Sequence, residues 1–149
     1  MNNSIDKSLE SFDFAEYLLS ETSNYRGQYK EVIVFTSQIF RLTCDLIYIE
    51  RLSRLEKNLL YKSVAYFILP RDIFSESIHG VKGFIDDLML CLYALNLIKD
   101  RHGNDLLFDL WDGKPSDLKE LLNVRFQILI KENKDMFNSV LHEVGEDEI

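Results

Sequence analysis

The residues best suited to chemistry are acidic side chains on both sides of one short polar segment. Asp72 and Glu76 follow the end of one predicted helix. Asp86 and Asp87 stand at the start of the next predicted helix. If these two helices pack antiparallel, both sets of carboxylates lie at the same end of the hairpin. Oxygen ligands of this kind suit a divalent cation, and Glu76 or His79 could complete the coordination shell.

The same carboxylates also have a structural explanation. Asp86 and Asp87 fall in the expected first turn of a helix, where unpaired backbone amides and the helix dipole favour negative charge. Asp72 follows a helix end and can cap a short turn. No predicted helix carries the Glu-x-x-His spacing of di-metal bundles. We therefore expect capping and loop anchoring, keep a divalent cation as the alternative, and predict no other cofactor.

No other combination of residues predicts catalysis. His79, His102 and His142 stand far apart in the chain. No Ser-His-Asp arrangement can be assembled from the sequence, and no glycine-rich phosphate loop follows a strand. Cys44 and Cys91 lie inside apolar helical patterns, so we expect them to pack in the core. The sequence leaves open whether the chain is an enzyme, and it favours a non-catalytic role.

Composition and charge limit the class of protein. The 149 residues are 46% hydrophobic, as in an ordinary globular domain. The formal net charge of -8 argues against nucleic-acid binding, because such proteins usually present a basic field. No apolar run predicts a transmembrane helix, and the N-terminal segment lacks the pattern of a secretory signal. We expect a cytoplasmic protein. Peripheral membrane contact is a weaker alternative, which the acidic charge disfavours.

The spacing of the apolar residues predicts an all-α fold. The longer helices are expected over residues 29–53, 55–69, 84–101 and 116–142, with shorter ones within 4–22 and 104–111. Pro70 should end the second long helix, and Gly80 and Gly83 allow a sharp hairpin turn after it. The helix over 84–101 is apolar on nearly all sides, which is typical of the central helix of a bundle.

Some side chains of this bundle can be placed from the sequence. Trp111 is expected to cover the core, because aromatic residues at helical spacing usually pack. The inward residues of the 55–69 helix are predicted to be Leu55, Leu59, Leu60, Val64, Phe67 and Ile68. The polar patch just before and within this helix is interpreted as a solvated helix face or connection, and consists of Glu50, Arg51, Arg54, Glu56 and Lys57.

Residues 59–98 contain a motif that consists of Pro70, Asp72, Ile73, Phe74, Glu76, Gly83, Asp86 and Asp87. With this motif the segment resembles the YkvA-like helical domains, a family of unknown function (domain of unknown function 1232). Ser75 replaces the second proline of the family, and Glu76 replaces its more usual aspartate. The resemblance implies a helical hairpin and little about activity. Some relatives occur beside membrane segments, which this sequence lacks.

These patterns together predict a single compact helical bundle around a central antiparallel hairpin. The domain spans residues 1–149, with N-terminal helices in 4–53, a YkvA-like core in about 55–101 and a C-terminal helix in about 116–142. The expected function is a non-catalytic interaction or regulatory module that binds another protein or itself. The alternative is a metal-dependent hydrolase that holds its ion with the carboxylates of Asp72, Asp86 and Asp87.

Overall fold

The computed structural model describes residues 14–68 and 83–146, and every regular element within these ranges is a helix. Residues 14–22 are helical. The elements that follow are α2 (Lys30–Ile33), α3 (Thr36–Leu46), α4 (Arg54–Ile68), α6 (Ile85–His102), α7 (Asn104–Leu110), α8 (Pro115–Glu120), the π-helical segment η2 (Leu121–Arg125), α9 (Phe126–Glu132) and α10 (Lys134–Glu143). The predicted all-α fold is confirmed.

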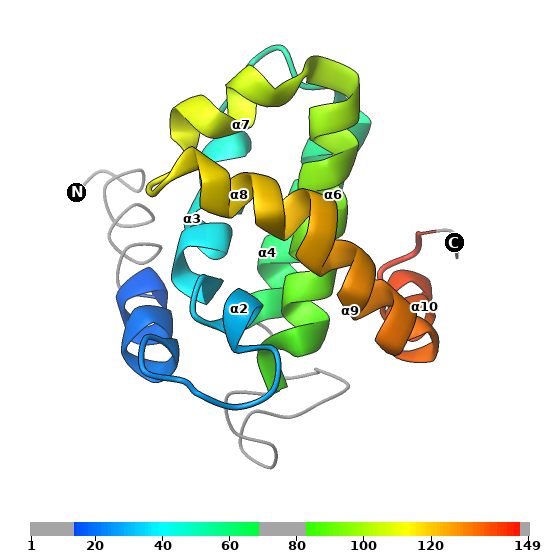
Figure 1. The fold of residues 1–149 in the computed structure, drawn as a ribbon. Coiled ribbons are helices and arrows are strands. Elements are labelled where there is room, and N and C mark those ends of the chain that lie inside the picture. The colour runs from blue at the N-terminus through cyan, green and yellow to red at the C-terminus, as the bar shows by residue number, and fades with distance from the viewer. Residues whose placement is uncertain (1–13, 69–82, 147–149) are drawn as a thin grey trace, which may run out of the picture.

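Helix α6 is the centre of the fold, as its apolar sequence predicts. It packs against α4, α3, α10, α9, α7 and α2, and every side chain from Ile85 to Leu92 is buried. Figure 1 shows α8, η2 and α9 running as one curved element across α6, with α10 folding back at its end. No helix in the described part of the chain is long and apolar enough to span a membrane.

The α4–α6 hairpin agrees closely with the sequence prediction. Its helices begin and end within one residue of the predicted bounds. Gly103 stops α6 in a left-handed conformation with φ of 88°, which glycine adopts without steric cost. Trp111 covers the core as expected, with 7% of its surface exposed. Pro70 and Gly80 lie outside the described residues, whereas Gly83 is buried just before α6.

The predicted helix over residues 29–53 is wrong as a single element. It is divided into α2 and α3, and α3 ends at Leu46. After α3, the amides of Ile47, Tyr48 and Ile49 bond to carbonyls three residues earlier. Such tight turns preserve a spacing of about three residues between inward side chains, so the apolar pattern continues after the α-helix has ended.

The predicted helix over residues 116–142 is also interrupted. Asn133 leaves helical geometry with φ of -132°, and it separates α9 from α10. Its side-chain amide donates to the Leu129 carbonyl at 3.0 Å and to the Tyr29 hydroxyl at 3.1 Å. This side chain competes with the regular backbone pattern and anchors the bend to the N-terminal half of the chain.

Two inward positions of α4 were predicted wrongly. Leu55 is 77% exposed and Ile68 is 55% exposed, whereas Leu59, Leu60 and Phe67 are buried. The inner face of α4 turns toward α6 and α3, and the apolar residues at its two ends are rotated away from that contact. The amphipathic pattern therefore predicted the helix correctly, but the prediction of which residues at its two ends are buried was wrong.

Candidate functional site

The acidic pair of the hairpin lies in the first turn of α6, as predicted, and both residues are fully buried. Asp86 and Asp87 are each 0% exposed. Asp86 Oδ1 accepts the backbone N–H of Asp87 at 3.0 Å, and Oδ2 accepts the Tyr66 hydroxyl at 3.3 Å. Asp86 thus accepts a backbone amide in the first turn of α6, and its bond with Tyr66 links α6 to α4.

The surroundings of this pair are part of the core. One turn further along α6, burial and, to a smaller degree, the charge of Asp87 raise the pKa of the Cys91 thiol. Burial also raises the pKa of the Cys44 thiol on α3, to about 12. Both cysteines are free and stay protonated at neutral pH, so they act as small packing groups rather than as nucleophiles.

The rest of the predicted acidic site is not part of the described structure. Asp72, Glu76 and His79 lie in residues 69–82, outside the described ranges. Among the residues that are described, no group of three His, Cys, Asp or Glu side chains is arranged to hold a metal ion. The structure therefore places two of the predicted carboxylates together and leaves their convergence with Asp72 a prediction.

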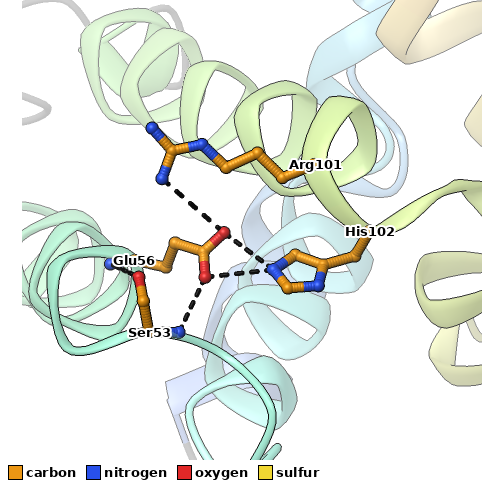
Figure 2. A network of polar contacts seen from close by, with 4 residues as sticks. All are labelled: Ser53, Glu56, Arg101 and His102. Carbon is orange, nitrogen blue, oxygen red and sulfur yellow. Dashed lines mark hydrogen bonds and ion pairs between the residues drawn. The ribbon is translucent and has the colours of Figure 1, made fainter.

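A second polar cluster, which sequence reasoning missed, joins the start of α4 to the end of α6 (Figure 2). Glu56 is 3% exposed, and its carboxylate oxygens lie 2.8 and 3.0 Å from Nε2 of His102. Arg101 Nη1 lies 3.8 Å from the same carboxylate. The backbone N–H of Ser53 donates to Glu56 at 2.7 Å, and the Glu56 N–H donates to Ser53 Oγ at 3.1 Å.

The cluster has a recognisable signal in the sequence. Ser53 and Glu56 form a capping box, the Ser-x-x-Glu arrangement that satisfies the first amides of a helix. The prediction that Glu56 belongs to a solvated polar patch is wrong, because capping turns its carboxylate inward. Burial opposes ionisation of Glu56, yet the bonds from Ser53 and the contact with His102 outweigh it and hold its pKa below the usual range.

The opposite face of α4 carries apolar residues in contact with solvent. Leu55 is 77% exposed, Tyr61 is 56% exposed and Ile68 is 55% exposed. Isolated exposed apolar residues are normal, but Tyr61 and Ile68 are two turns apart on nearly the same side of one helix, and Leu55 lies about 120° around it from Tyr61. We call the exposed residues Arg54, Leu55, Asn58, Tyr61, Ala65 and Ile68 the outer face of α4. The outer face is an accessible surface of the hairpin. The residues of α4 that belong to the polar clusters, Glu56 and Tyr66, are buried on the other side of the helix.

Comparisons with known proteins agree with the motif in the sequence. Residues 57–93 match the model of a family described as "Protein of unknown function (DUF1232)". The chain is also 28% identical over 125 residues to "Uncharacterized protein ORF9" from Methanothermobacter thermautotrophicus. The aligned region covers 84% of this chain and 77% of that relative. No solved structure matches the chain. The matched residues comprise most of α4 and the first half of α6, so the similarity to this family lies in the α4–α6 hairpin.

Proposed function

We propose that this chain is a non-catalytic helical module that acts by binding another protein or a second copy of itself. The observation that carries the proposal is the outer face of α4, where Leu55, Tyr61 and Ile68 project into solvent. Exposing such side chains lowers solubility, and contiguous apolar surface is typical of interaction sites. Most of the face, from Asn58 to Ile68, lies within the segment that the DUF1232 model matches.

The polar clusters support the same proposal. Glu56 is engaged by Ser53, His102 and Arg101, and Asp86 by Tyr66 and a backbone amide. These contacts hold helices together, so Glu56 and Asp86 each have a structural role that requires no substrate. A structural core with an apolar outer face is the arrangement expected of a binding module.

The experiment is a direct test of association with the full chain. Light scattering after size-exclusion chromatography, at several protein concentrations, measures self-association. Capture from a lysate of the native cell, with an unrelated acidic helical protein on the control resin, measures binding to other proteins. We expect either a concentration-dependent dimer or a specific captured protein. A strict monomer that captures nothing beyond the control would overturn the proposal.

The competing function is a metal-dependent hydrolase that uses Asp72, Asp86 and Asp87. The observation in its favour is that Asp86 and Asp87 are adjacent and fully buried at one end of the hairpin, where a buried carboxylate gains from a positive partner. Its test is a calorimetric titration of a divalent cation into wild type and the Asp72→Asn variant.

A further inference from the structure

We propose that the outer face of α4 is a docking site for an acidic amphipathic helix of a partner protein. The inference rests on the proposed function and adds the chemistry of the partner. It is carried by two independent properties of the face, which are the spacing of its exposed residues and the sign of its charge.

The spacing is that of a surface that packs against another helix. Arg54, Asn58, Tyr61, Ala65 and Ile68 are all exposed, and they follow one another at alternating intervals of four and three residues. This is the period of a seam between two helices packed at a shallow angle. Asn58 and Ala65 are small, so a partner helix can approach closely between the larger Tyr61 and Ile68 side chains. Leu55 extends the apolar surface at one end.

Arg54 lies on the outer face and the half-buried Lys57 borders it, so the local charge is opposite to that of the molecule. The basic residues of α4 are Arg54, Lys57 and Lys62, and its one acid, Glu56, is turned into the fold toward His102. Lys62 is paired with Glu146 at 2.8 Å. Within residues 14–68 and 83–146, Arg54 and Lys57 form no ion pair. A protein with a net charge of -8 therefore presents a cationic, apolar helix surface, whose electrostatic complement is acidic.

The same features disfavour two other occupants. A second copy of α4 would bring the same cations, Arg54 and Lys57, to the contact, so it offers no charge complement to the face. An anionic membrane would also attract Arg54 and Lys57, but it makes no use of the four-and-three spacing of the face, which is that of a helix–helix seam. An acidic amphipathic helix complements the charges of Arg54 and Lys57 and can pack along the exposed residues at helical spacing. It is the occupant we assign.

The test uses the full chain and two labelled synthetic peptides of about 21 residues, which is about six helical turns. Both have Leu and Ile at alternating intervals of three and four, with Glu at the flanking positions of one peptide and Lys in the other. Fluorescence anisotropy measures their binding at low salt. We expect the acidic peptide to bind at least about tenfold more tightly than the basic one, a difference of about 1.4 kcal/mol.

Variants locate the binding to α4. Tyr61→Ser removes the central apolar contact, and the double variant Arg54→Glu, Lys57→Glu reverses the charge. Each should weaken binding of the acidic peptide at least about tenfold. The matched control is the double variant Val124→Ser, Ile128→Ser, which removes two exposed apolar side chains from η2 and α9 and should bind as the wild type does. Circular dichroism verifies that each variant is folded.

Each remaining outcome contradicts the inference in an identifiable way. Equal binding of the two peptides, no binding, or wild-type binding by the α4 variants would overturn it. Binding to phosphatidylserine vesicles without binding to the acidic peptide would identify a lipid surface instead. A dimer in sedimentation that Tyr61→Ser dissociates would identify a second copy. A protein captured from lysate equally well by wild type and Tyr61→Ser would support the proposed function and overturn this assignment of its site.

Discussion

Glu56 shows how a carboxylate can be buried at the junction of two helices. Removing a charge from water is costly unless hydrogen bonds and an opposite charge compensate for it. The Ser53 amide supplies a local donor, and His102 and Arg101 approach from the end of α6. One side chain thus caps α4 and fixes the position of α6 against it.

The first prediction is that Glu56→Gln destabilises the fold. Gln keeps an acceptor for the Ser53 amide but loses the charge that faces His102 and Arg101. The expected loss in the free energy of unfolding is about 1.5–3 kcal/mol, the usual range for a hydrogen bond to a charged group. Urea denaturation measures it. The control is Glu50→Gln, a change at an exposed acid that should stay within about 0.5 kcal/mol. Equal effects of the two substitutions would contradict the role of Glu56.

The second prediction concerns pH. The pKa of Glu56 is lowered in the folded chain from its ordinary value of 4.5. Because the folded state holds this proton less tightly, ionised Glu56 contributes stability that is fully present above pH 4.5 and is lost as the pH falls through the lower folded pKa. The stability difference between wild type and Glu56→Gln should therefore shrink on acidification. A difference that grows as the pH falls would show the opposite sign of the shift.

At the scale of elements, α4 and α6 differ in how completely they are covered. Helix α6 is surrounded by other helices and buries residues on all its faces. Helix α4 packs against α6 and α3 and leaves its outer face in solvent. Equivalent apolar side chains on the two helices should therefore differ in their contribution to stability.

The third prediction compares the same substitution on these two helices. Leu95 on α6 is 0% exposed and Leu55 on α4 is 77% exposed. Leu95→Ala should cost about 2–5 kcal/mol, because it leaves a cavity in the core. Leu55→Ala should change stability by less than about 0.5 kcal/mol, because the side chain is already in water. Chemical denaturation of both variants tests the contrast. Similar losses would mean that the outer face of α4 is covered within the chain.

The fourth prediction is that Mg²⁺, Ca²⁺ or Mn²⁺ leaves the melting temperature unchanged. This is the expected result if Asp72, Asp86 and Asp87 cap and anchor the hairpin. A metal site would instead stabilise the fold by about 2.7 kcal/mol at a hundredfold excess over the dissociation constant. Calorimetric titration of wild type and Asp72→Asn separates the two. A single-site binding curve that the variant loses would favour the hydrolase.

At the scale of the whole molecule, the described helices share one core. The core extends from Ala15, before α2, to Leu141 in α10. Trp111 packs at one end of it, where its ring centroid lies 6.1 Å from that of Phe35. The indole N–H donates to the Lys114 carbonyl at 3.1 Å. Elements near both ends of the chain therefore depend on the same set of contacts.

The fifth prediction is that the described helices unfold together. Trp111 is the only tryptophan, so its fluorescence reports the α7–α8 end of the molecule, while far-ultraviolet circular dichroism reports all helices. If the core is cooperative, the two signals should give the same midpoint in urea. A separate tryptophan transition would show that α7 and α8 melt independently of the α4–α6 hairpin.

The sequence by itself determined the fold class, the α4–α6 hairpin and the central place of α6. These follow from local information: the period of the apolar residues, a glycine at position 103 that can stop a helix, and a helix with apolar residues on nearly every side. The presence of Asp86 and Asp87 in the first turn of α6 was equally predictable. The Ser53–Glu56 capping box was present in the sequence as well, although the surrounding charges obscured it.

Only the tertiary structure decided where the long apolar patterns are broken and which of their residues are buried. Asn133 ends α9 by reaching Tyr29, which is 104 residues away in the chain. His102 meets Glu56 across 46 residues. Leu55 fits an inward pattern and remains in solvent, because no described helix covers that side of α4. A periodic pattern defines the faces of a helix, whereas the partner of each face depends on how distant segments pack.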